Sequence, residues 1–268
     1  MQKKSDQLPI GIFDSGVGGL TVMKEIARLL PEEDMIYLGD TARVPYGTRS
    51  PETVRRYSLK NARFLMSEGI KILVVACNTS SAVSLDLLRA HLPVPVVGVV
   101  EPGAKAAVAA TSAKKVAVIG TEATINSGAY ERAIKAIDNS IAVTGVPCPL
   151  FVPIIEEGWI EGEVVSLTAE RYLSLLGNNN VDALVLGCTH YPMIKSVING
   201  IVQIPLIDSA VETAKEVGRI LDSENLMRVN KGNVSKEFFV TDSPDKFITT
   251  GKRFLGHNIE NISKIDLD

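Results

Sequence analysis

The sequence contains few cysteines and no long apolar segment. Its three cysteines include no CxxC pair, which argues against a disulfide scaffold and fits a reducing compartment. No stretch reaches the roughly 18 uncharged apolar residues that indicate a membrane-spanning helix. The N-terminal segment carries two lysines but no apolar core of signal-peptide length, so we expect a cytoplasmic protein without a membrane partner.

An excess of basic charge is also missing. Lysine and arginine number 28 against 31 aspartates and glutamates, which gives a net charge of -3. Nucleic acid is therefore not expected as the main partner. Hydrophobic residues make up 46% of the chain and charged residues 22%, as in ordinary folded proteins. The length of 268 residues predicts one or two domains.

The common nucleotide-binding motifs are absent too. No GxxxxGKS or GxxxxGKT segment occurs, and Gly16, Gly18 and Gly19 in DSGVGGLTV have the wrong spacing for GxGxxG. These glycines follow an apolar run, so their backbone N–H groups are suited to hold a phosphate or carboxylate at a helix start. A tight strand-to-helix turn that needs glycine explains the same pattern. Asp14 also places a negative charge where a dinucleotide phosphate would lie.

Apolar runs of strand length alternate with helix-like segments along most of the chain. These runs are mostly continuous rather than alternating, as expected of parallel strands that helices cover on both faces. The pattern predicts an α/β fold with doubly wound, mostly parallel sheets. The expected strands span residues 10–14, 35–39, 72–76, 94–99, 116–120 and 183–187.

Helix signals fill the gaps between these runs. Ser50, followed by Pro51 and Glu52, indicates a helix start, and this helix is expected to end at Glu68. Further along we expect a helix at 163–176, a polar turn at 178–180, a helix at 211–221, a polar linker at 222–236 and a last strand in EFFVTD that returns to the first lobe.

A weak internal repeat divides the chain into two halves. IGIFDSG and VAVIGTEAT each open a half, and a strand that ends in cysteine follows 63 residues after Asp14 and 67 residues after Thr121. The similar spacing predicts two similar α/β lobes with a cleft between them. We expect residues 1–98 and 211–268 to form the first lobe and residues 99–210 to form the second.

Cys77 and Cys188 occupy matching positions in these halves, in ILVVACNTSSAV and ALVLGCTHYPMI. Ligands of open α/β sheets bind at the carboxyl ends of strands, so both thiols are expected to face one substrate. A single buried cysteine is more often a small core residue, and this is our interpretation of Cys148, which lies between two prolines. A zinc site built from Cys77, Cys188 and His190 would need a fourth ligand that is not evident.

Polar residues gather after the same strand ends. Asn78 and Thr79 follow the first cysteine, and Thr189 and His190 follow the second. At helix starts these groups are able to hold a carboxylate and an ammonium, or merely to cap the helices. The segment PYG at 45–47 follows the second strand, where it forms either a pocket wall or a simple turn.

Two opposed thiols suit the removal of a proton from one face of a carbon acid and the return of a proton to the other face. One cysteine must begin as thiolate and its opposite as thiol. A free thiol has a pKa of about 8.5, which a helix N-terminus or a nearby histidine lowers. With each sulfur about 3 to 3.5 Å from the substrate carbon, the sulfurs are expected about 6 to 7 Å apart, too far for a disulfide.

Six motifs, in this order and spacing, resemble those of the glutamate racemases of the aspartate/glutamate racemase family. They are DSGVGGLTV, GDTARVPYG, ACNTSSAV, IGTEATINSG, PLFVPIIEEG and GCTHYP, and together they extend over nearly the whole chain. The resemblance implies two lobes with pseudo-twofold symmetry, glutamate between them, and an isomerase that uses neither pyridoxal phosphate nor metal. It also implies a homodimer that supplies D-glutamate for peptidoglycan synthesis, and thus for the cell wall and cell shape.

The resemblance further implies roles for individual residues. Cys77 matches the base that deprotonates D-glutamate, and Cys188 matches the base that deprotonates L-glutamate. Asp14 and His190 match the groups that assist these two thiols.

An additional acid is implied near the second thiol. Glu156 matches it, although the segment IIEEG leaves the neighbouring Glu157 as an alternative. The substrate contacts carried over from the family are Asp14, Ser15, Pro45, Tyr46, Gly47, Asn78, Thr79, Thr121, Thr189 and His190.

Two other hypotheses stay open at this point. One is a related amino-acid racemase, such as one for aspartate, because the sequence does not define the pocket for the γ-carboxylate. The other is a non-catalytic module that binds small anions, which would keep its function after Cys77→Ala or Cys188→Ala.

Overall fold

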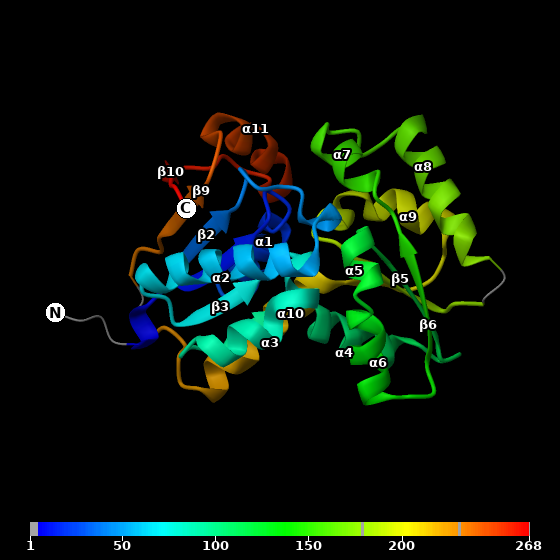
Figure 1. Ribbon diagram of the computed structural model, residues 1–268, viewed down its shortest axis with the longest axis horizontal. Helices are drawn as coiled ribbons and strands as arrows, with labels where there is room; N and C mark the ends of the chain where they lie inside the picture. Colours follow the sequence, from blue (N-terminus) through cyan, green and yellow to red (C-terminus); the bar gives the residue numbers. More distant parts are fainter. Residues whose placement is uncertain (1–4, 178–179, 230–231, 268) are drawn as a thin grey trace.

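The chain folds into two α/β lobes that lie side by side (Figure 1). The computed structural model describes residues 5–177, 180–229 and 232–267. Parts of the predicted turn at 178–180 and of the predicted linker at 222–236 therefore lie outside the described residues. The predicted fold class, with parallel sheets in two lobes, is confirmed.

Within the described residues, the first lobe contains a six-stranded sheet. Its strands are β1 (Ile10–Asp14), β2 (Met35–Gly39), β3 (Ile72–Val75), β4 (Val96–Gly98), β9 (Lys236–Val240) and β10 (Ile262–Lys264). Their order is β10-β9-β2-β1-β3-β4, and all neighbours are parallel. All residues of β1, β2 and β3 are buried, which explains why these runs are apolar throughout. The tail returns to this lobe, as expected, because β9 pairs with β2.

The second lobe repeats this plan with a four-stranded parallel sheet in the described part of the chain. Its strands are β5 (Lys115–Gly120), β6 (Ala142–Pro147), β7 (Ala183–Gly187) and β8 (Leu206–Asp208). The order β6-β5-β7-β8 corresponds to β2-β1-β3-β4 of the first lobe. Cys77 and Cys188 follow the equivalent strands β3 and β7, so the repeat accounts for their matching positions.

Helices pack on these sheets and carry the polar loops. They are α1 (Leu20–Leu29), α2 (Pro51–Ser67), α3 (Asn78–His91), α4 (Val100–Ala110), α5 (Glu122–Asn126), α6 (Ala129–Ile137), α7 (Phe151–Glu156), α8 (Glu163–Leu173), α9 (Lys195–Ile201), α10 (Ser209–Ser223) and α11 (Pro244–Leu255). As predicted, the Ser50 side chain caps α2 by accepting a hydrogen bond from the Thr53 N–H. Among the described helices, none has both the length and the apolar character needed to cross a membrane.

Some predicted details differ from the structure. The strand expected at 94–99 is limited to β4, because Pro95 at its start lacks an N–H for the ladder. The strands β6 and β8 were not expected, since β6 lies at a sheet edge and has a single buried residue, and β8 has only three residues. Thr189 and His190 precede a 3-10 turn over Tyr191–Ile194 rather than an α-helix.

The lobes meet along α10. This helix packs against α1 of the first lobe and against α4, which contacts β7 of the second sheet. The boundary between the lobes is thus formed by α1, which precedes the second lobe in the chain, by α4 within it, and by α10, which follows it.

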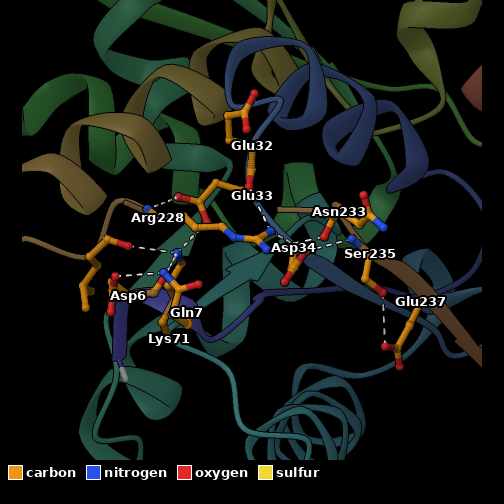
Figure 2. A network of polar contacts seen from close by, with 11 residues as sticks. Asp6, Gln7, Glu32, Glu33, Asp34, Lys71, Arg228, Asn233, Ser235 and Glu237 are labelled. Carbon is orange, nitrogen blue, oxygen red and sulfur yellow. Dashed lines mark hydrogen bonds and ion pairs between the residues drawn. The ribbon is translucent and has the colours of Figure 1, made fainter. Parts of the chain in front are cut away.

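A buried charge network ties the tail to the amino ends of the first-lobe strands (Figure 2). Lys71 Nζ lies 2.5 Å from a carboxylate oxygen of Glu33, and it donates hydrogen bonds to the carbonyl oxygens of Asp6 and Leu226 at 2.9 and 2.8 Å. The other Glu33 oxygen accepts from the N–H of Arg228 at 2.9 Å. The side chains of Lys71 and Glu33 are only 1% and 2% exposed, so each charge depends on the other.

Candidate active site

The carboxyl ends of both sheets border one cavity of about 300 Å³. Loops after β1, β2 and β3 form one side, and loops after β5, β6 and β7 form the other. All but one of the predicted site residues lie on its wall, and the exception, Asp14, is completely buried behind it. The predicted residues on the wall are Ser15, Pro45, Tyr46, Gly47, Cys77, Asn78, Thr79, Thr121, Glu156, Cys188, Thr189 and His190.

Cys77 lies immediately before α3, at the N-cap position of that helix. Its Sγ is 3.7 Å from Ser15 Oγ. Burial raises the pKa of the Cys77 thiol to about 12, and the nearby Asp14 carboxylate adds to the rise, while the Ser80 N–H acts in the opposite direction. Cys77 is therefore a protonated thiol at neutral pH.

Asp14 ends β1 and lies completely buried near this thiol. One of its oxygens, Oδ2, accepts a hydrogen bond from the Gly16 N–H at 2.9 Å. The other, Oδ1, is buried and has no partner among the described residues. Burial raises the pKa of Asp14, although His190 partly offsets this effect. A buried acceptor without a partner is costly, so Asp14 is suited to receive a proton or a cationic group.

The glycines after Asp14 are needed for close packing at the same place. A Cβ on Gly18 would lie 2.3 Å from Thr189 Oγ1 and 2.4 Å from the His190 ring, and a Cβ on Gly19 would lie 2.5 Å from Asp14 Cβ. The lack of a side chain at Gly18 thus lets Thr189 and His190 of the second lobe pack closely against this turn of the first lobe. This accounts for glycine at both positions without a bound phosphate.

The second thiol belongs to a chain of three polar side chains. Cys188 Sγ lies 3.9 Å from His190 Nδ1, and His190 Nε2 lies 3.0 Å from Glu156 Oε1. Burial alone would lower the pKa of His190, but Cys188 and Glu156 outweigh it and raise that pKa to about 10. Burial also opposes ionisation of Glu156, yet the hydrogen bond and charge of His190 hold the pKa of Glu156 below its ordinary value. The pair is therefore an imidazolium and a carboxylate at neutral pH.

Helix α11 supports this pair from outside the cavity. The Phe254 ring meets the His190 ring edge-on, with centroids 5.3 Å apart. Arg253 Nη1 donates a hydrogen bond to the carbonyl oxygen of Glu156 at 3.0 Å. The sequence motifs did not identify these two residues, because α11 lies about 60 positions after His190 in the chain. Glu157, the alternative to Glu156, is not part of the cavity wall.

Asp40, which directly follows β2, holds the PYG loop in place through Tyr46. The Tyr46 hydroxyl donates a hydrogen bond to Asp40 Oδ2, and it accepts one from Asn61 Nδ2 at 3.1 Å. Arg43 pairs with the other Asp40 oxygen at 2.8 Å. This network holds the loop against the second lobe, where a Cβ on Gly47 would lie 2.8 Å from Thr121.

Hydroxyl groups join the lobes at one border of the cavity. Thr79 Oγ1 lies 2.9 Å from Thr121 Oγ1 and 3.2 Å from Thr124 Oγ1. Thr121 also caps α5, since it accepts a hydrogen bond from the Thr124 N–H. Thr121 therefore combines a capping role with a place on the cavity wall.

Cys148 lies apart from the cavity, and the described residues form no metal-ligand cluster. Cys148 is completely buried, its Sγ lies 3.5 Å from the Val146 carbonyl oxygen, and it does not reach the cavity wall. In the described part of the chain, no three His, Cys, Asp or Glu side chains are arranged to hold a metal ion. All three cysteines are free thiols.

Comparison with known proteins agrees with this arrangement. The family model described as Asp/Glu/Hydantoin racemase matches residues 10–217. A glutamate racemase of Geobacter metallireducens is 55% identical over 261 residues, which cover 97% of each chain. The crystal structure of glutamate racemase from Francisella tularensis in complex with D-glutamate is similar with a TM-score of 0.94 and 41% identity, over 98% of this chain and 99% of the other. The glutamate racemase of Thermus thermophilus, solved with β-chloro-D-alanine, has a TM-score of 0.90 and 44% identity over the same shares.

Proposed function

The chain belongs to the aspartate/glutamate/hydantoin racemase family and is an isomerase, and from this premise we propose that it interconverts L- and D-glutamate with Cys77 and Cys188 as the two bases. The observation that carries the proposal is the position of the two thiols, which follow equivalent strands of two lobes and border one cavity. High identity to glutamate racemases over nearly the full chain supports the choice of substrate.

The proposed reaction begins with Cys188 as thiolate and Cys77 as thiol. His190 places a positive charge beside this sulfur, with its Nδ1 3.9 Å from Cys188 Sγ. The thiolate takes the α-proton of L-glutamate, and the electron pair of the broken C–H bond passes to the α-carbon and its carboxylate. Cys77 then donates its proton to the opposite face, which gives D-glutamate. The reverse reaction begins with Cys77 as thiolate and uses the opposite order.

The two halves of the site assist these thiols in different ways. Asp14, with a raised pKa and an Oδ1 that no described residue bonds, is placed to exchange a proton with the Cys77 half. His190, bound to Glu156, keeps a positive charge beside Cys188. Substrate binding is assigned to the hydroxyl, amide and loop groups on the wall, namely Ser15, Pro45, Tyr46, Gly47, Asn78, Thr79, Thr121 and Thr189.

The proposal includes a cellular role. The product D-glutamate would serve peptidoglycan synthesis in the cytoplasm, by a homodimer that uses no cofactor. The resemblance of the motifs to glutamate racemases is the support for this part.

A deuterium-exchange experiment tests the proposed function. Purified protein, treated with a chelator and freed of pyridoxal phosphate, is incubated in D₂O with L-glutamate, D-glutamate or either enantiomer of aspartate. We expect both glutamate enantiomers to racemise and to gain deuterium at the α-carbon, and aspartate to react much more slowly. Absence of both racemisation and exchange with glutamate would contradict the proposal, and faster reaction of aspartate would replace it by an aspartate racemase.

A further inference from the structure

A tyrosine outside the cavity wall contacts one of the groups that form it. Tyr130 lies in α6 of the second lobe, and its hydroxyl donates a hydrogen bond to Asn78 Oδ1 at 2.7 Å. Asn78 is the first residue of α3 in the first lobe and follows Cys77 directly. The bond thus crosses the boundary between the lobes at the catalytic cysteine.

The Tyr130 ring has little freedom to move. A Cβ on Gly103 of α4 would lie 3.3 Å from one ring carbon, and a Cβ on Gly187 at the end of β7 would lie 3.2 Å from another. The two glycines therefore leave the space that the ring fills. Tyr130 is 3% exposed, so the hydroxyl is held in one place away from solvent.

The hydrogen bond from Tyr130 holds one end of the Asn78 amide and leaves the other end toward its other neighbours. A side-chain amide carries an acceptor at one end and two donors at the other. The hydrogen bond to Tyr130 occupies the acceptor, Oδ1. The donor, Nδ2, is buried and has no partner among the described residues, while Asn78 forms part of the cavity wall.

We infer that Tyr130 is a positioning residue, which fixes the Asn78 amide so that its NH₂ group donates to a carboxylate of the bound amino acid. With the amide reversed, Oδ1 would meet the carboxylate, and two acceptors would repel each other. Such a ligand gives this buried NH₂ group the acceptor that no described residue supplies. The inference rests on the proposed function, because it takes glutamate as the ligand.

The first test is Tyr130→Phe, which removes only the hydroxyl. The hydrogen bond from Asn78 is already formed in the bound substrate, so its weakening lowers the binding of both enantiomers and chiefly raises KM. We expect KM for both enantiomers to rise by about 10- to 100-fold. Tyr172→Phe is the matched control, because its hydroxyl accepts from the Leu150 N–H in the same lobe, away from Asn78, and KM should not change.

A double-mutant cycle tests whether Tyr130 acts through Asn78. Asn78→Ala should raise KM, and Tyr130→Phe added to it should change KM by less than about twofold. Asn78→Asp keeps an acceptor for Tyr130 but turns a second oxygen toward the substrate, so it should weaken binding more than Asn78→Ala. Calorimetric binding of D-glutamate provides a readout that does not depend on turnover.

The outcomes separate this inference from the proposed function. If the unchanged protein neither binds nor racemises glutamate, the proposed function fails. If it racemises glutamate but the effects of Tyr130→Phe and Asn78→Ala multiply, or Tyr130→Phe lowers kcat at constant KM, the positioning role of Tyr130 is wrong. It is also wrong if Asn78→Asp binds D-glutamate as well as the unchanged protein does.

Discussion

Glu156→Gln is the substitution that most directly tests the charge arrangement around Cys188. The Glu156 carboxylate lies 3.0 Å from His190 Nε2, and a glutamine of the same shape keeps an acceptor there but removes the negative charge. The pKa of His190 is raised from 6.5 to about 10 by Cys188 and Glu156 against the effect of burial. This rise corresponds to about 5 kcal/mol in favour of the imidazolium.

The expected loss of activity depends on how much of the imidazolium stabilisation Glu156 supplies. If the carboxylate supplies about half of this stabilisation, its removal costs the imidazolium about 2 to 3 kcal/mol, so at pH 8.5 the protonated fraction of the His190 ring, and with it kcat/KM, falls roughly 2- to 6-fold. The raised pKa keeps the ring protonated below about pH 10 in the unchanged protein, and the substitution moves deprotonation toward lower pH. At pH 6 both proteins hold the imidazolium, so the loss should be several times smaller.

The assay is racemisation of L- and D-glutamate followed by circular dichroism from pH 6 to pH 9.5. Glu157→Gln is the matched control, since Glu157 neighbours Glu156 but does not border the cavity, and its profile should be unchanged. The two enantiomers have equal free energy in water, so kcat/KM must fall by the same factor in both directions. The reasoning is refuted if Glu156→Gln lowers kcat/KM by the same factor at every pH. It is also refuted if Glu157→Gln lowers kcat/KM as Glu156→Gln does.

Three further outcomes are expected. Cys188→Ser should reduce racemisation by at least about 1,000-fold in both directions, while D-glutamate, but not L-glutamate, still exchanges its α-hydrogen in D₂O; Cys77→Ser should show the reverse preference. Arg253→Met, which loses the hydrogen bond to the last carbonyl of α7, should lower kcat by about 3- to 10-fold, and an unchanged pH–rate profile and kcat would exclude a role for this contact. Lys71→Met should lower the free energy of unfolding in urea by about 3 to 5 kcal/mol, because Glu33 is left as an unpaired buried charge, and the double variant with Glu33→Leu should recover most of that loss.

Much of the fold was predictable from local patterns. Buried parallel strands need apolar side chains on both faces, so β1, β2, β3 and β7 appear as continuous apolar runs. Edge strands carry a weaker signal, which explains why β6 was missed. The exact division into lobes at 98/99 and 210/211 stays a prediction.

The site was predictable where its residues lie next to a strand end, as Cys77, Asn78, Cys188 and His190 do. Supporting residues lie far away in sequence and give no local signal. Tyr130, for example, is 52 positions from the Asn78 amide that it contacts. Only the folded chain brings such pairs together, so the sulfur–sulfur separation and the catalytic roles stay predictions.

The path of the chain also has a consequence for its synthesis. The ribosome makes β1 to β4 first, then the whole second lobe, and only afterwards β9, which covers the edge strand β2. Until then β2 is an open, fully apolar sheet edge, the kind of surface that pairs with other chains. The contacts of Lys71 and Glu33 with Leu226 and Arg228 also form late. A chain that stops before residue 236 would hold both cavity thiols, Cys77 and Cys188, and yet be prone to aggregate.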